Sequence, residues 1–394
     1  MGLTPPATDF PAASREDWLK RVNAVLKGAS IETLVSKTAD GIAIEPLYGQ
    51  ASGPRAGRAA HAPWTVSQRA DHPDGASANL QALDDLTNGA TGLTLTFKGH
   101  ASARGFGLAA KHLPRVLDTV ALHAIALRLE GGVAEAKALA AMIAKQPIDP
   151  GRLDVSFGLE NAKPVDALAA QGFRGPFLEA DGRPWHDKGA TEAQELGAVL
   201  AAAVAHLRAL ERPALGVTLA AGQDMFLTLA KFRAMRLLWR RVLEASGLAD
   251  EPLRIHGETS WRMMAKLDPH SNILRAVAAV FGAGLGGADS ICVLPFSLAQ
   301  GLPDAFARRV ARNVQTVLLE ESNLWRVADP ASGSGTVEHL TQALCEKAWG
   351  VFQRIEKNGE WPKPDAQSAP GLPIIGTRSY RLEKEHAAAV ESIA

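Results

Sequence analysis

The apolar and polar positions of this chain follow two alternating patterns. From about residue 90, short apolar runs bounded by turn residues alternate with longer segments whose apolar residues recur every three or four positions. The first pattern predicts buried strands, and the second predicts helices packed on one side. The predicted strands cover residues 92–97, 119–127, 152–159, 176–180, 215–220, 253–257, 290–295 and 324–329.

The predicted helices lie between these strands. The long ones cover residues 133–146, 190–210, 224–245, 272–281, 305–321 and 336–355, and short ones are expected near 107–117 and 164–171. Eight strand-then-helix units predict an α/β fold, a (β/α)8 TIM barrel. A doubly wound parallel sheet is the alternative that this pattern also allows.

The two ends of the chain have a different composition. Residues 1–85 are rich in Pro, Gly, Ala and Ser, with one helical segment at 15–26, which predicts an extended N-terminal arm. The barrel is expected over residues 86–360. Residues 361–394 are expected to form a Pro-rich tail followed by a short C-terminal helix at 381–390.

One glycine motif resembles a dinucleotide-binding loop. Gly282, Gly284 and Gly287 form G-x-G-x-x-G, but a helical segment precedes them and a strand-like segment follows. A dinucleotide loop needs the opposite order, strand then helix. The glycines are therefore expected to end a helix, because glycine tolerates the left-handed conformation found there.

Composition excludes several classes of protein. The 394 residues are 46% hydrophobic and 21% charged with a formal net charge of zero, so we expect a large core and neither nucleic acid nor a membrane as partner. No run of 18 apolar residues is present. The two cysteines, Cys292 and Cys345, form no C-x-x-C, which indicates a reducing cytoplasm rather than a disulfide framework or a cysteine zinc site.

Several segments, in order along the chain, resemble the barrel region of methylmalonyl-coenzyme A mutase. They are GIAIEPLYG, APWTVSQ, WHDKGATEAQELG, DMFLTLAKFRAMRLLW, TSWRMMAKLDPHSNILR, GGADSICVLPF, GLPDAFARRVARNVQTVLLEES and RVADPASGSGTVEHLTQALCEKAW. The resemblance implies a (β/α)8 barrel with an arm that contacts a partner subunit. It also implies a radical rearrangement of an acyl-CoA by adenosylcobalamin. The chain has no Asp-x-His-x-x-Gly cobalamin motif, and we expect no C-terminal flavodoxin-like cobalamin domain.

Residue by residue, the resemblance to the catalytic chains is incomplete. His186 matches the family's catalytic histidine, but Arg69 stands where catalytic chains carry a tyrosine. Ser156 and Gly158 stand in place of a Thr-x-Gln that contacts the thioester, and Leu298 falls near an adenosyl-binding glutamate. His186 is therefore the candidate catalytic residue, and Arg69 and Ser156 are candidates for substrate binding.

His256 and Glu258 are the remaining candidates for substrate binding. They lie two apart on a predicted strand and should point to the same side. This places them either in a buried acid–base pair or in structural hydrogen bonds, and the latter is the simpler interpretation.

With these differences, the sequence resembles the small, non-catalytic subunit of heterodimeric mutases more than the large subunit. The resemblance implies a degenerate barrel, inactive alone, that supports a catalytic large subunit, with adenosylcobalamin bound by the partner and none by this chain. The first alternative is the acyl-CoA-binding half of a split mutase whose cobalamin subunit is a separate chain. The second is a barrel that binds acyl-CoA without catalysis.

Overall fold

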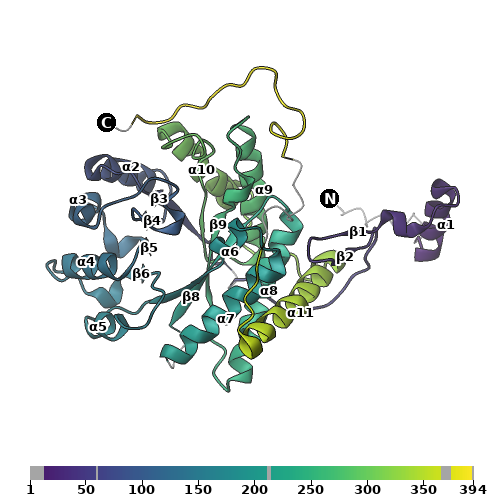
Figure 1. Cartoon of the computed structure of the whole chain (residues 1–394), viewed down its shortest axis with the longest axis horizontal. Helices are drawn as coiled ribbons and strands as arrows, with labels where there is room; N and C mark the ends of the chain where they lie inside the picture. The colour runs from purple at the N-terminus through teal and green to yellow at the C-terminus, as the bar shows by residue number, and fades with distance from the viewer. Residues whose placement is uncertain (1–12, 59–60, 211–213, 365–373, 393–394) are drawn as a thin grey trace, which may run out of the picture.

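A computed structural model describes residues 13–58, 61–210, 214–364 and 374–392. A parallel eight-stranded sheet forms the centre, with helices around it and an arm projecting to one side (Figure 1). The strands of the sheet are β3 (Thr65–Ala70), β4 (Gly92–Thr96), β5 (Ala126–Glu130), β6 (Asp154–Ser156), β7 (Leu178–Asp181), β8 (Leu215–Ala221), β9 (Arg254–Thr259) and β10 (Ser290–Cys292).

The sheet closes into a barrel. Its order is β6-β5-β4-β3-β10-β9-β8-β7, so only β6 and β7 are left at the ends. These ends meet through a parallel bridge between Leu159 and Leu178, where the Leu159 N–H donates to the Phe177 carbonyl at 3.0 Å. The predicted (β/α)8 barrel is therefore confirmed.

Helices cover the outer face of the barrel. They are α2 (Gly75–Thr87), α3 (Leu113–Val116), α4 (Val133–Ile143), α5 (Val165–Ala170), α6 (Arg183–Asp187), α7 (Glu192–Leu210), α8 (Met225–Ala245), α9 (Ser271–Gly286), α10 (Ala305–Thr316) and α11 (Gly335–Asn358). The core lies between these helices and the outward side chains of the strands, such as Leu93, Leu95, Leu127, Leu129 and Ile255. Helix α11 packs across α7 and α8.

One strand of the barrel was not predicted, and one predicted strand is not formed. The first strand of the barrel is β3, which lies inside the predicted arm, so the boundary at residue 85 is too late and α2 also belongs to the barrel. The predicted strand at 324–329 forms turns, because Asp329 is held by the guanidinium of Arg233 at 3.0 Å. The total of eight strands came from one omission and one false strand.

Two further predictions differ from the structure in detail. The strand predicted at 119–127 begins only at Ala126, because Thr119 adopts a left-handed backbone with φ 60° and a short helical turn follows. The predicted C-terminal helix at 381–390 is not formed. The backbone there runs extended, and the Glu391 N–H donates to the Leu302 carbonyl at 2.8 Å instead of closing a helical turn. Residues 365–373 of the predicted tail lie outside the described residues.

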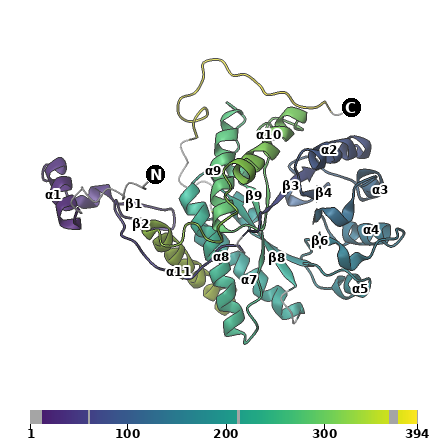
Figure 2. The same ribbon diagram turned by 180° about the vertical axis from the view of Figure 1, so that it is seen from behind.

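The arm is the part of the chain that stands apart from the barrel, as both sides of the molecule show (Figures 1 and 2). Its helix α1 (Arg15–Leu26) forms where the sequence predicts it and begins at Ser14, whose hydroxyl accepts from the Asp17 N–H. None of its residues is buried. A short hairpin of β1 (Ser36–Lys37) and β2 (Ala43–Ile44) joins it to the barrel, where Asp40 accepts from the Ala193 N–H at 3.1 Å.

The glycine motif is a helix terminus, as the sequence predicts. Helix α9 contains Gly282 and Gly284 and ends at Gly286, and Gly287 follows with φ 99°. The chain then enters β10. Among the described residues, no helix combines the length and the apolar character needed to cross a membrane.

Candidate functional site

The side chains that point to the barrel axis are mostly polar. Strands alternate their side chains between two sides, and on β5 Leu127 and Leu129 face the helices while Arg128 and Glu130 face the axis. On β9 the axis receives His256 and Glu258. The axis is thus lined by residues that can recognise a polar ligand or pair with one another.

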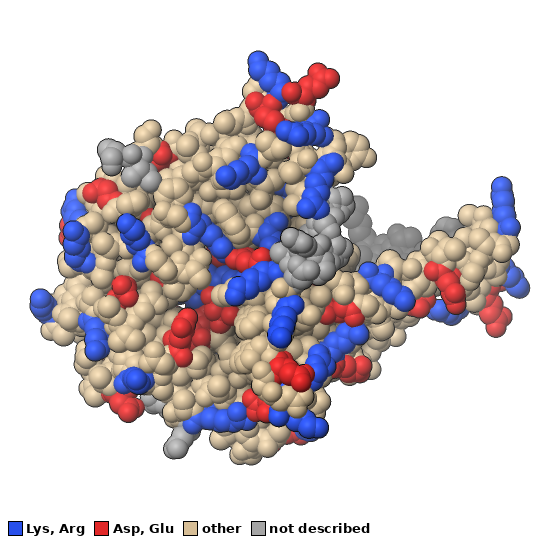
Figure 3. Space-filling model, viewed as in Figure 1, with Lys and Arg blue, Asp and Glu red and all other residues tan. Residues whose placement is uncertain are grey.

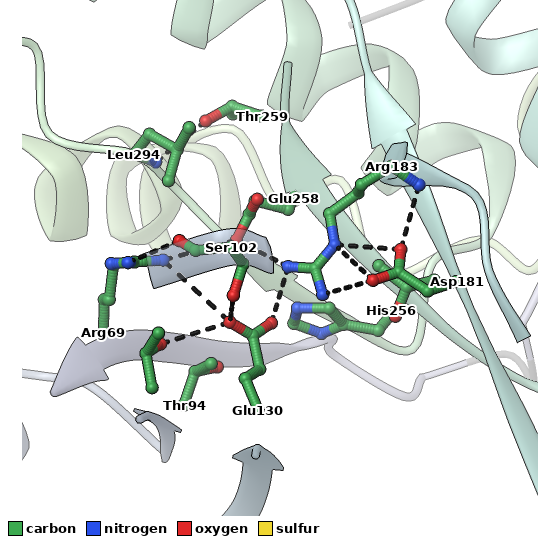
Figure 4. A network of polar contacts seen from close by, with 12 residues as sticks. Arg69, Thr94, Ser102, Glu130, Asp181, Arg183, His256, Glu258, Thr259 and Leu294 are labelled. Carbon is green, nitrogen blue, oxygen red and sulfur yellow. Dashed lines mark hydrogen bonds and ion pairs between the residues drawn. The ribbon is translucent and has the colours of Figure 1, made fainter. Parts of the chain in front are cut away.

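In the carboxyl-terminal half of the barrel, these side chains pair with one another (Figure 4). The Arg183 guanidinium donates to Glu130 at 2.6 Å and to Glu258 at 2.9 Å. Arg69 lies 3.9 Å from each of these two carboxylates, and it donates to Asp71 at 2.5 Å. All five side chains are buried, so this network fills the axis at the end where barrel enzymes place their active sites.

A second buried pair lies next to this network. Arg128 donates to both oxygens of Glu179, one of them at 2.5 Å, and to the Thr218 hydroxyl at 2.9 Å. Bidentate arginine–carboxylate pairs of this kind are geometrically specific and strong. The guanidinium of Arg128 also approaches Glu130 at 3.5 Å, which joins the two groups into one layer across the barrel.

The two glutamates of the network have opposite pKa shifts. Burial alone would raise the pKa of Glu130, but the guanidinium of Arg183, with those of Arg128 and Arg69, holds it well below its usual value. Burial raises the pKa of Glu258, and although Arg183 opposes this shift, the charge of Glu130 adds to it. The network therefore stabilises the charge of Glu130 more than the charge of Glu258.

The amino-terminal half of the axis is more open. A cavity of about 330 Å³ opens there. Its lining includes Ser67, Arg128, Ser156, Glu179, His256 and Ser290. His256 binds the Ser290 hydroxyl through Nδ1 at 2.7 Å, while its buried Nε2 has no hydrogen-bond partner. Burial and the nearby charge of Arg128 hold the pKa of His256 well below its usual value, so its ring is neutral.

His186 lies away from the axis, in α6. Its Nδ1 is 3.1 Å from the Glu195 carboxylate, and its Nε2 is 2.7 Å from the Ser260 hydroxyl. His186, Glu192 and Glu195 would form a plausible ligand set for a metal. The ammonium of Lys231 lies 2.5 Å from Glu192 and 2.9 Å from Glu195, so a lysine already supplies the positive charge.

The structure brings together two of the five candidate residues. Arg69 and Glu258 meet in the buried network, whereas Ser156 and His256 line the amino-terminal cavity and His186 lies in a separate cluster. His256 and Glu258 share the axial side but do not bond to each other. Each has its own partner, which agrees with the structural interpretation of the pair.

Four buried residues of the site were missed by sequence reasoning: Arg128, Glu130, Glu179 and Arg183. Arg128 and Glu130 carry a readable signal, because they alternate with leucines in the segment ALRLE. The predicted strand ended at residue 127, just before them. Arg183 is the first residue of α6, which follows β7, and nothing in its local sequence indicates that its side chain reaches back to the axis.

The outer face visible in Figure 3 shows no large area of one charge. Figure 3 shows Lys and Arg interspersed with Asp and Glu over the visible face, and side chains of both signs gather near its centre. In contrast to this face, the barrel axis holds its charges in buried pairs.

The fold and the axial residues define a class: α/β barrels with a polar axis that is filled at its carboxyl-terminal end. Residues 177–383 match the sequence profile of methylmalonyl-CoA mutase. The methylmalonyl-CoA mutase small subunit of Streptomyces virginiae is 40% identical, over 89% of this chain and 65% of that protein. The small subunit of Propionibacterium freudenreichii subsp. shermanii is 32% identical, over 91% and 64%. Methylmalonyl-CoA mutase of Escherichia coli is 27% identical, over 94% and 64%.

The chain belongs to the methylmalonyl-CoA mutase family, as a barrel of the small-subunit type. It spans less than two thirds of the length of each of these relatives.

Proposed function

We propose that this chain is a non-catalytic barrel that pairs with a catalytic, adenosylcobalamin-dependent acyl-CoA mutase and supports its assembly. One observation carries the proposal: Arg69, Glu130, Arg183 and Glu258 fill the carboxyl-terminal half of the barrel axis with buried ion pairs. An acyl-CoA extending along the axis would have to displace these side chains and leave their charges without partners, which costs several kcal/mol for each buried ion.

The same residues do not fit adenosylcobalamin at this end of the barrel. The family's radical chemistry would need the reacting acyl group to be accessible to the cofactor. Here paired guanidinium and carboxylate groups occupy the carboxyl-terminal half of the axis. His270, in the segment that most resembles a cobalamin motif, instead lies 5.0 Å from the Phe296 ring, centroid to centroid. We therefore place adenosylcobalamin and the acyl-CoA on the partner.

The arm offers a surface for that partner. Helix α1 has no buried residue, and Val25 on it is 79% exposed. An isolated helix of 12 residues is marginally stable in water. Docking of its apolar side chains, which include Trp18 and Leu19, on a partner subunit would supply the missing stability.

The compartment follows from the same proposal. Cys292 and Cys345 are both free thiols in the structure. We place the assembly in the reducing cytoplasm, where acyl-CoA substrates are also available to the partner.

The test is an affinity purification of the full chain from its own cell extract, with every partner identified by mass. We expect a mutase large subunit that carries its own barrel and cobalamin domain. Recovery of a cobalamin-loaded partner of only about 130–150 residues, the size of one small domain, would overturn the proposal, because this barrel would then be the catalytic half.

A matched pair of variants tests the role of the arm. Trp18→Ala combined with Leu19→Ala should weaken partner recovery at least tenfold, since both apolar side chains lie on the helix that stands apart from the barrel. Leu80→Ala, on the barrel helix α2 and 67% exposed, should leave recovery unchanged. Equal recovery with both variants would exclude the arm as the contact.

A further inference from the structure

Two serine–histidine pairs lie at opposite ends of the barrel, and they differ in what holds the second ring nitrogen. Ser260 Oγ lies 2.7 Å from His186 Nε2, and Ser290 Oγ lies 2.7 Å from His256 Nδ1. The other nitrogen of His186 faces the Glu195 carboxylate at 3.1 Å. The other nitrogen of His256 has no hydrogen-bond partner.

Glu195 fixes the proton positions of the first pair. The carboxylate is fully buried, and it accepts from the Ala220 N–H and from the Lys231 ammonium, each at 2.9 Å. Burial would raise the pKa of Glu195, but Lys231 and the hydrogen bond of His186 lower it to about 2. An ionised carboxylate only accepts hydrogen bonds, so His186 Nδ1 donates to it. With its proton on Nδ1, the ring presents the lone pair of Nε2 to the Ser260 hydroxyl, which donates to it.

We propose that Ser260, His186 and Glu195 form a nucleophile–base–orienting relay that attacks small carboxylic esters or thioesters. This activity is distinct from mutase chemistry. The three roles are recognised by geometry rather than by position in the sequence.

The reaction balances without a further reactant except water. Ser260 Oγ attacks the acyl carbonyl while His186 Nε2 takes its proton, and the bond to the leaving oxygen or sulfur breaks as His186 returns that proton to it. Water then attacks the acyl-serine with His186 again as the base. The products are a carboxylic acid, the alcohol or thiol, and the free serine.

Ser260 is only 2% exposed, and the route by which a substrate would reach it is the cavity beside it. A cavity of about 650 Å³ is lined by both Ser260 and His186 and lies at the carboxyl-terminal end of the strands, where barrels place reacting groups. Its volume suits a small organic molecule. The backbone of the relay is held in place, since the Ser260 N–H donates to the Ala221 carbonyl at 2.7 Å and Arg262 donates to the His186 carbonyl at 3.0 Å.

The test uses the purified full chain and an alkyl fluorophosphonate, a probe that phosphonylates activated serines. Peptide mass spectrometry should find the label on Ser260 and not on Ser290. The labelling rate should fall roughly a hundredfold in His186→Gln, in keeping with the loss of a general base. p-Nitrophenyl acetate should be hydrolysed slowly by the wild-type chain and not by Ser260→Ala.

Ser290→Ala is the matched control, because it removes the serine of the pair that lacks a carboxylate. In this variant Ser260 should be labelled at the wild-type rate. If His186→Gln does not fold, as judged by circular dichroism, Glu195→Gln replaces it and should slow labelling at least tenfold. An unlabelled Ser260 in the folded wild-type chain, or equal labelling of Ser260 and Ser290, would overturn the proposal.

Discussion

The two halves of the barrel axis are built on the same strands but end in opposite states. Towards the amino-terminal end, β3 contributes Ser67 and β9 contributes His256, and a cavity opens between them. One step of two residues further along, the same strands contribute Arg69 and Glu258, and the axis is filled. Side-chain length and charge at alternate positions therefore decide whether this barrel is open, while the strand geometry stays the same.

The filled half depends on its pairs being complete. A buried ion pair contributes little net stability when it is intact, but loss of one partner leaves an uncompensated charge and costs much more. At the rim of the open half, the charges of Arg254 and Asp154 are half-exposed and therefore solvated, although the buried Arg128–Glu179 pair also borders this cavity. This contrast can be tested by removing one cation from each half.

The largest effect is expected for Arg183→Met, which keeps most of the side-chain volume and removes the charge. Glu130, Glu258 and Asp181 all lose their contact with the guanidinium, so the free energy of unfolding should fall by about 3–5 kcal/mol. Arg254→Met at the amino-terminal end removes only a half-exposed pair with Asp154 and should cost about 0–1 kcal/mol. Urea denaturation measures both, and similar losses would contradict the contrast between the halves.

An intermediate effect is expected when the two central glutamates are compared. Glu130→Gln removes a carboxylate whose charge the surrounding arginines stabilise, and it should cost about 1.5–3 kcal/mol, the range for hydrogen bonds to charged groups. Glu258→Gln replaces a group that burial already shifts towards its neutral form, so the loss should stay within about 1 kcal/mol. Thermal unfolding at neutral pH measures the difference, and the reverse order would show that the two charges are assigned to the wrong residues.

The smallest effect is expected in the pH dependence of stability, because a group in each half should titrate in a different pH range. The pKa of His256 is lowered in the folded chain, so the unfolded chain binds more protons below its usual value of 6.5, and stability should fall as pH drops through 6.5. The pKa of Glu130 is also lowered, from its usual 4.5, so its contribution is lost only below about pH 4.5. Each proton contributes about 1.4 kcal/mol per pH unit.

Two variants separate these pH windows. His256→Gln should make stability depend less steeply on pH between 6.5 and about 5. Glu130→Gln should do the same below about pH 4.5. Denaturation midpoints measured across this pH range provide the readout. A change of slope in the same window for both variants would mean that the halves do not titrate independently.

Much of the fold was predictable from periodicity. The long helices were located within a few residues, and α1 over its whole length, because each carries a clear apolar stripe. Strand β3 was missed because its axial side chains, Ser67 and Arg69, are polar and its outward face includes Gln68. Its apolar residues are only Val66 and Ala70, four positions apart. A strand lining a polar axis lacks the apolar run by which a buried strand is recognised.

The site was less predictable, because it depends on contacts between distant strands. Strand alternation predicted that His256 and Glu258 point to the same side. The other contacts of the network were not predicted. Glu130 and Arg183 are 53 residues apart and meet only because β5 and β7 face a common axis. No local sequence pattern indicates a contact between residues so far apart in the chain. The resemblance to the family points to Arg69 but does not identify the residues that pair with it.

The filled axis also constrains which sequences can descend from this one. Arg69 and Arg183 each pair with both Glu130 and Glu258. A single replacement that removes one of these side chains therefore leaves a buried charge with fewer partners, which is costly. Several codons would have to change together. The shared ion pairs of the axis therefore make an open channel unreachable by any single substitution that leaves all the buried charges paired.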